Sequence, residues 1–170
     1  MRRLLDGLYD AAAALAALFM VLLLVMVMLS ILGRQLHFNL PGVDAYAGYM
    51  MAGAGFLALA HTFKRGEHIR VTLLLSQMPP RLRRAFEIWS LFAASGVAVL
   101  FAFYSSKLAW QSRAFHDVST ASDATPLWLP QLTMALGSLI LAIAFLDELV
   151  LELRGRRPRP DAGDELLRNE

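Results

Sequence analysis

The sequence contains no cysteine, and its long apolar stretches have no charged residue near their centres. Without cysteine, the chain can form no disulfide framework, thiolate metal site or cysteine nucleophile. In membrane proteins that move ions or organic acids, charged residues or broken helices at mid-membrane depth mark the pathway. Because the apolar stretches have neither feature, we do not expect this chain to build a complete transport site alone, and we expect no catalytic site.

The hydrophobic residues, which make up 57% of the 170, are gathered into four runs. Crossing roughly 30 Å of hydrocarbon takes about 20 helical residues, and every run reaches or nearly reaches that length. The spans must be helical because lipid offers the backbone no hydrogen-bond partner. The sequence therefore predicts an all-α membrane protein whose integral membrane domain occupies 1–153. The four transmembrane helices are expected over about 11–33, 44–63, 86–108 and 126–148.

The basic residues are unevenly distributed between the connections. The chain has 16 Lys and Arg residues, and all but Arg34, Lys107 and Arg113 lie in the N-terminus, the middle connection or the C-terminal tail. Cytoplasmic loops carry such an excess, so both termini and the middle connection are predicted to be cytoplasmic. This orientation accounts for the basic loop, and we expect no nucleic-acid partner. The tail over 154–170 is polar, carries Pro and Gly, and is predicted to be disordered.

The middle connection also contains an apolar stretch over about 68–78 that is too short to span a membrane. Its apolar and polar residues interleave, which predicts a short amphipathic helix lying in the membrane interface between the second and third spans. Arginines and tryptophans near the ends of the spans are expected to anchor the protein at the headgroups, in contact with membrane lipid. These anchors are Arg81, Arg83, Arg84, Trp89, Trp110 and Trp128.

Small residues recur at helical spacing in three of the spans, which is typical of faces where helices pack closely. The sequence does not tell whether these faces meet helices of this chain or of another subunit. The candidate packing residues are Ala45, Gly48, Ala52 and Gly55 in the second span, Ala94, Ala98 and Ala102 in the third, and Ala135, Ser138 and Ala142 in the fourth.

Two further hypotheses belong to other functional classes. The first is a haem-binding membrane anchor of a redox complex, for which His61 and His68 are the only conceivable pair of axial ligands. The structural alternative is that these histidines are interfacial and bonded to backbone or water. The second hypothesis is a self-sufficient small transporter that acts as an oligomer. Apart from haem in the first hypothesis, no cofactor or metal is expected.

The middle of the chain resembles a known family. The chain has two spans, a charged motif over 66–71, the residues Pro79-Pro80-Arg81, and then two more spans. This order is similar to that of the small, Q-type (DctQ-like) membrane subunit of tripartite ATP-independent periplasmic (TRAP) transporters. The resemblance covers about 4–153, and Trp128, Pro130 and Gly137 in the last span contribute to it. Thr72 departs from the family, where many members carry an acidic residue. The most specific residues are Gly66, Glu67, His68, Ile69, Arg70 and Val71.

This resemblance implies a supporting role in the bacterial inner membrane. In such systems a large multi-span permease subunit holds the substrate and sodium sites, and a periplasmic binding protein transiently delivers a carboxylate such as a C4-dicarboxylate or sialic acid. The small subunit forms a stable complex with the large one and braces its stationary scaffold. For Glu67, His68 and Arg70 the expected role is to fix the loop against headgroups or the large subunit.

Overall fold

The computed structural model describes residues 2–38, 41–64, 79–122 and 124–154. These residues form four α-helices: α1 (Arg2–Gln35), α2 (Val43–Lys64), α4 (Pro80–Ala114) and α5 (Trp128–Leu153). Each helix is long and apolar enough to cross a membrane, which confirms the predicted all-α architecture with four candidate spans. The predicted interfacial helix over 68–78 and the polar tail from 155 onwards lie outside the described residues.

Three of the helices extend beyond the predicted spans at both ends, whereas α5 begins at Trp128, two residues after the predicted start, and extends only beyond the predicted end. With 34 residues in α1 and 35 in α4, these two helices are each about 50 Å long, well above the roughly 30 Å of a hydrocarbon core. In α4 the extension begins with Pro80 and includes the arginines of the predicted headgroup anchor. Proline suits the first helical turn and arginine is a good helix former, so the polar flank continues the helix.

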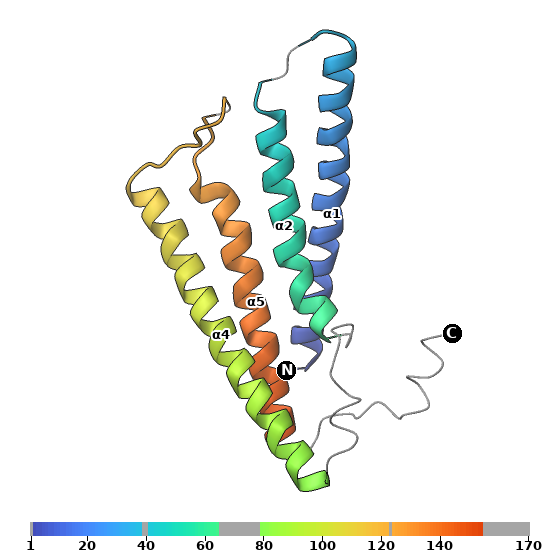
Figure 1. The fold of residues 1–170 in the computed structure, drawn as a ribbon, viewed down its shortest axis with the longest axis vertical. Coiled ribbons are helices and arrows are strands. Elements are labelled where there is room, and N and C mark those ends of the chain that lie inside the picture. The colour runs from blue at the N-terminus through green and yellow to red at the C-terminus, as the bar shows by residue number, and fades with distance from the viewer. Residues whose placement is uncertain (1, 39–40, 65–78, 123, 155–170) are drawn as a thin grey trace, which may run out of the picture.

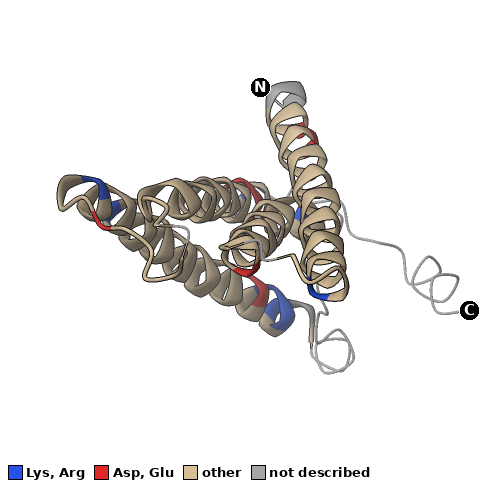
Figure 2. Ribbon diagram, turned by 90° about the horizontal axis from the view of Figure 1, so that it is seen from above, with Lys and Arg blue, Asp and Glu red and all other residues tan. Residues whose placement is uncertain are grey.

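The four helices form an open row (Figure 1). Along this row, α1 packs on α2, α2 packs on α5, and α5 packs on α4. Seen from above, α1 and α4 occupy the two ends of the row (Figure 2). The two central helices therefore have a neighbour on each side, while the two outer helices each leave a broad surface uncovered.

The molecule also has two different ends along the direction of the helix axes. We call the end where α2 finishes and α4 begins the charged end, and the end with the 36–42 and 115–127 connections the hairpin end (Figure 1). At the charged end, Tyr9, Phe63, Leu91 and Ala144 bring all four helices into one buried cluster. The two hairpins, α1 with α2 and α4 with α5, splay apart from there toward the hairpin end (Figure 1).

Small residues set the distance between the central helices. A Cβ atom at Gly137 of α5 would lie 2.5 Å from the carbonyl carbon and oxygen of Phe56 in α2. Glycine is therefore what permits the two backbones to approach this closely. On the other side of α5, Ala98 and Ala102 of α4 are buried together with Ala142.

Both hairpins begin with the same kind of helix ending. His37 after α1 and His116 after α4 each have a φ of 55°, in the left-handed region. In each case the next amide bonds back to the helix: Phe38 N donates to Gly33 O, and Asp117 N donates to Ser112 O, both at 2.9 Å. Such bonds satisfy the last carbonyl groups of a helix and turn the chain sharply. The ending therefore returns the chain toward the next span.

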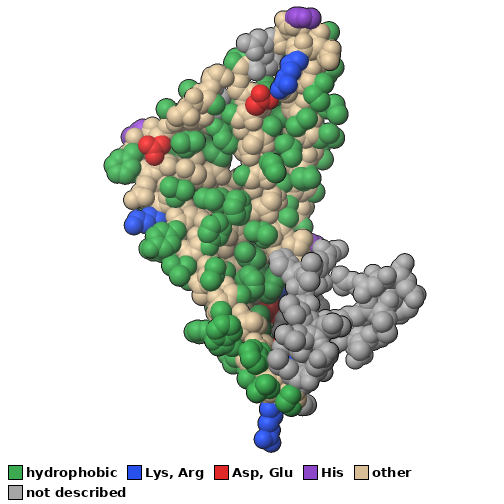
Figure 3. Space-filling view, viewed as in Figure 1, with side chains coloured by type: hydrophobic (Ala, Val, Ile, Leu, Met, Phe, Trp, Pro, Cys, Tyr) green, Lys and Arg blue, Asp and Glu red, His purple; other side chains and the backbone are tan. Residues whose placement is uncertain are grey.

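Apolar side chains cover much of the surface that the helices present (Figure 3). A row of helices in lipid can expose such residues because the surrounding hydrocarbon is as apolar as they are. Among the predicted anchors, Trp89 and Trp110 are exposed toward the two ends of α4, whereas Trp128 is half-buried. The exposed arginines Arg81 and Arg84 lie at the charged end of the same helix.

Candidate functional site

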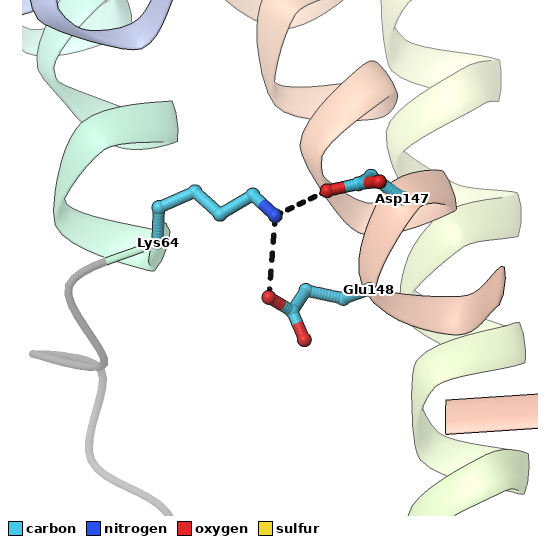
Figure 4. A network of polar contacts seen from close by, with 3 residues as sticks. All are labelled: Lys64, Asp147 and Glu148. Carbon is cyan, nitrogen blue, oxygen red and sulfur yellow. Dashed lines mark hydrogen bonds and ion pairs between the residues drawn. The ribbon is translucent and has the colours of Figure 1, made fainter. Parts of the chain in front are cut away.

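The most elaborate polar contact of the described residues joins α2 to α5 at the charged end (Figure 4). Lys64, the last residue of α2, directs its ammonium group at two neighbouring carboxylates of α5. Its Nζ donates to Asp147 Oδ2 and, at 3.3 Å, to Glu148 Oε1. All three side chains are largely covered, with exposed fractions of 19%, 25% and 15%. We call these three residues the Lys64 cluster.

The first helix joins this cluster through Tyr9. The Lys64 ammonium lies 5.4 Å from the centre of the Tyr9 ring, a distance at which a cation is attracted to the electron-rich face. Tyr9 is only 3% exposed, and its hydroxyl has no hydrogen-bond partner among the described residues. The cluster therefore connects α1, α2 and α5 at one point.

A second contact between α1 and α2 lies one helical turn before Lys64. His61 Nδ1 is 3.7 Å from Asp10 Oδ1, so the two groups form an ion pair when the imidazole is protonated. The His61 side chain is 20% exposed and that of Asp10 is 75% exposed. His68, the other histidine of the haem hypothesis, lies outside the described residues.

The chemistry of the Lys64 cluster is that of a fixed electrostatic contact. Charges that are shielded from water interact more strongly than exposed ones. They also become costly when one partner is removed, because the remaining charge is left without compensation. The parts of the chain that the structure describes hold no group of three or more His, Cys, Asp or Glu side chains placed to bind a metal ion. The cluster is thus suited to holding helices together.

The polar contacts at the hairpin end are more exposed. Asp44, in the first turn of α2, accepts a hydrogen bond of 2.9 Å from the Ser30 hydroxyl of α1 and lies 3.9 Å from Arg34. These groups border a shallow recess of about 260 Å³. Both charged side chains are about 80% exposed, so water screens their attraction. This end is held less firmly than the charged end.

The second hairpin makes its own contacts there. The Arg113 guanidinium lies 5.3 Å from the centre of the Trp128 ring, joining the end of α4 to the start of α5. The connection between them folds back on itself, with Ser119 N donating to Thr125 O at 2.8 Å. Thr125 in turn donates its hydroxyl proton to Tyr46 Oη at 3.1 Å. This bond links the second hairpin to α2.

The structure separates the predicted small-residue faces into two groups. In α4 and α5 the buried members are Ala98, Ala102, Ala135, Ser138 and Ala142, and Ala94 is half-buried. In α2, Ala45 and Ala52 are half-buried, while Gly48 and Gly55 are exposed. The predicted faces of the last two helices therefore serve the packing of this chain, whereas much of the α2 face is open.

Sequence reasoning missed two features of this arrangement. The pairing of Lys64 with Asp147 and Glu148 was not predicted, although both acidic residues end the last span at the depth where Lys64 ends the second. Gly137 was not among the predicted packing residues of the fourth span, yet it lies where the backbones of α2 and α5 approach closely. Its neighbours Ala135 and Ser138 were the available signal, because they mark that part of α5 as closely packed.

A family comparison now decides what kind of protein this is. Residues 23–155 match the family described as tripartite ATP-independent periplasmic transporters, DctQ component, and this match covers well over half of the chain. The chain belongs to the DctQ family. As a DctQ protein it is the small membrane subunit of a TRAP transporter, and its four candidate spans make it a multi-pass membrane protein. No curated protein matches the chain.

The family match divides the residues of the charged end. Lys64, Asp147 and Glu148 fall within the matched range, as does the Gly66–Val71 motif, which lies outside the described residues. Tyr9 and Asp10 of α1 precede the match. The ion-pair link between α2 and α5 therefore lies in the part of the chain that matches the family, and the contacts of α1 with it lie outside.

Proposed function

We propose that this DctQ protein is a non-catalytic subunit that braces the large permease subunit of its transporter. The large subunit carries out sodium-coupled uptake of a carboxylate, such as a C4-dicarboxylate, sialic acid or a similar organic acid. A periplasmic binding protein delivers the substrate through transient contact. The small subunit stays in stable complex with the large one and does not itself hold the substrate.

The observation that carries this proposal is the open row of helices. In the most apolar 18-residue stretch of α1, only 6% is buried within this chain, and the corresponding shares for the other three helices are 22% to 28%. Such a surface is suited to contact with lipid and with a large membrane partner. At the same time, the apolar runs carry no charged residue near their centres that could form a pathway for an ionic substrate.

We further propose that the charged end faces the cytoplasm of a bacterial cell and that the spans lie in its inner membrane. The basic residues of the N-terminus, the middle connection and the tail support this orientation, because cytoplasmic segments carry an excess of Lys and Arg. The hairpin end then faces the periplasm, where the binding protein acts.

In this orientation the family motif begins directly after the Lys64 cluster. Lys64 is the last described residue before the motif, and its contacts with Asp147 and Glu148 fix the end of α2 against α5. This rigid starting point supports a bracing role for Gly66, Glu67, His68, Ile69, Arg70 and Val71 against the large subunit or the lipid headgroups.

The proposal is tested by affinity purification of this chain from its native membrane in mild detergent, followed by uptake assays in proteoliposomes. We expect the large subunit to co-purify, and we expect carboxylate uptake only when both subunits, the binding protein and a sodium gradient are present. Uptake by this chain alone would instead support a small oligomeric transporter. A Soret absorption band in the purified chain would support a haem anchor.

A further inference from the structure

A groove of about 370 Å³ lies between α1 and α2. Ala13 and Ala17 of α1 form one wall, Gly55 and Ala58 of α2 form the other, and His61 lies at the end nearer the charged end. Nearly all of this lining is apolar. The groove lies within the candidate membrane spans, so either a lipid chain or a protein helix could occupy it.

The glycines of α2 distinguish between these two occupants. A Cβ atom at Gly48 or Gly55 would have no atom of another helix within 4 Å, whereas Gly53 and Gly137 face close neighbours. Packing within this chain therefore does not require glycine at 48 or 55. Glycine is an unfavourable helix residue, and its benefit in a membrane helix is the close approach of a second backbone.

The other exposed surfaces of the row have a different composition. The open face of α5 is built from Leu129, Leu132, Leu136, Leu139 and Leu146, and the exposed large side chains of α1 beyond the groove are Leu, Val, Ile and Met. The open face of α4 includes Gly96, but this glycine lies among the exposed Phe92, Val99 and Leu100 and not beside other small residues. Such bulky side chains pack well against fluid lipid, and a lipid chain gains nothing from glycine at 48 or 55. The small-residue groove is therefore suited to a helix.

A pair of carboxylates extends the groove toward the charged end. Asp6, Asp10, Ala13 and Ala17 follow one another at spacings of 4, 3 and 4, which places them along one face of α1. Both aspartates are exposed, and Asp10 lies close to His61 across the groove. If this end is cytoplasmic, a helix from another membrane subunit tends to carry Lys or Arg at the same depth. Its charge is then complementary to that of the aspartates.

We propose that this groove receives a transmembrane helix of the large permease subunit, with a basic residue at its cytoplasmic end paired with Asp6 and Asp10. This inference rests on the proposed function, because it names the face through which the bracing contact is made. The helix packs its backbone close to Gly55 in the groove and then passes Gly48, two turns further toward the hairpin end on the same face of α2. Its larger side chains fill the space beside Ala13, Ala17 and Ala58.

The test compares two glycine substitutions at positions where an added Cβ atom meets no other helix of this chain within 4 Å. Gly55→Leu fills the groove, and Gly96→Leu places the same side chain on α4, where a Cβ atom also meets open space. We expect Gly55→Leu to lower recovery of the large subunit about tenfold in mild-detergent co-purification, as overpacking of a helix contact does. Gly96→Leu should recover it as well as the wild type. Equal recovery for both variants overturns the proposed face.

The aspartates are tested separately. The Asp6→Lys/Asp10→Lys double variant should lose the large subunit, because the helix end then meets like charge, while Asp117→Lys at the hairpin end should retain it. Retention in the double variant overturns the predicted pairing. If the wild type itself never retains a large subunit, the proposed function fails, and this outcome is distinct from failure of the groove.

Cross-linking identifies the occupant directly. A photo-reactive residue at position 17 or 55 should form an adduct with the large subunit in native membranes, whereas the same residue at position 96 should not. An adduct with a second copy of this chain, with lipid alone or with nothing overturns the proposal. This measurement holds even if the leucine variant at position 55 proves unstable.

Discussion

The ammonium group of Lys64 is paired with the carboxylate of Asp147, 83 positions further along the chain. This contact joins the two central helices of the row at the end where all four helices converge. At the opposite end, the two hairpins are connected more weakly, through the hydroxyl groups of Thr125 and Tyr46. The fold is therefore held most firmly at the charged end, where the family motif begins.

The first prediction concerns the stability supplied by this pair. Lys64→Met should lower the free energy of unfolding by about 2 kcal/mol, since a largely covered, charged hydrogen bond is lost and the two neighbouring carboxylates lose the cation that they share. Thermal unfolding of the detergent-solubilised chain, followed by tryptophan fluorescence, measures the change. The same pair can be examined by a double-mutant cycle with Asp147→Leu, in which we expect strong coupling.

Arg83→Met provides the matched control for that measurement. Arg83 pairs with Glu87 at 3.0 Å within α4, four residues away, and the arginine side chain is 41% exposed. Pairs of this kind contribute only a few tenths of a kcal/mol, about 0.5 at most. A similar destabilisation by both substitutions would show that the Lys64 cluster has no special role in joining the helices.

The second prediction concerns the approach of α2 and α5. Gly137→Ala should destabilise the chain, because the new methyl group would lie 2.5 Å from backbone atoms of Phe56 and would force the two helices apart. Overpacking of this kind costs about 1 to 3 kcal/mol. Gly96→Ala, which adds a methyl group in open space on α4, should leave stability unchanged or slightly raised. Equal melting temperatures for the two variants would contradict this account of Gly137.

The sequence predicted the spans because their determinants are local. A run of about 20 apolar residues must form a helix in lipid whatever surrounds it. The first three predicted spans lie within helices of the structure, and the fourth does so from Trp128 onwards, two residues after its predicted start. The ends were less well predicted. The extension of α4 from position 86 back to Pro80 depends on arginine continuing a helix outside the hydrocarbon, which apolarity alone does not indicate.

The contacts between helices could not be predicted in the same way. The pairing of Lys64 with Asp147 depends on α2 and α5 being neighbours, and nothing local to either segment states this. The small residues of α2 illustrate the same limit. Their spacing predicted a packing face, but only the arrangement of the row shows that Gly48 and Gly55 are exposed and that a Cβ atom at either would meet no other helix of this chain within 4 Å.

The third prediction concerns the family motif in the middle connection. Arg70→Glu or Gly66→Val should weaken retention of the large subunit, because the first reverses a charge of the proposed bracing segment and the second replaces glycine, the residue with the greatest backbone freedom, by a stiff β-branched one. Co-purification in mild detergent and uptake in proteoliposomes measure the effect. Arg154→Glu, which reverses an exposed charge at the end of α5, is the control and should retain the partner. Unchanged retention and uptake in both motif variants would refute a bracing role for this segment.

The last prediction concerns orientation, on which the cytoplasmic placement of the motif and of the aspartates depends. Because the chain has no cysteine, a single introduced thiol can be labelled without background. Ser122→Cys in the connection at the hairpin end should react with a membrane-impermeant maleimide once the outer membrane is opened. Arg154→Cys at the charged end should react only after the inner membrane is also permeabilised. The reverse pattern would place the basic middle connection in the periplasm, and the argument that a partner helix carries basic residues beside Asp6 and Asp10 would then fail with it.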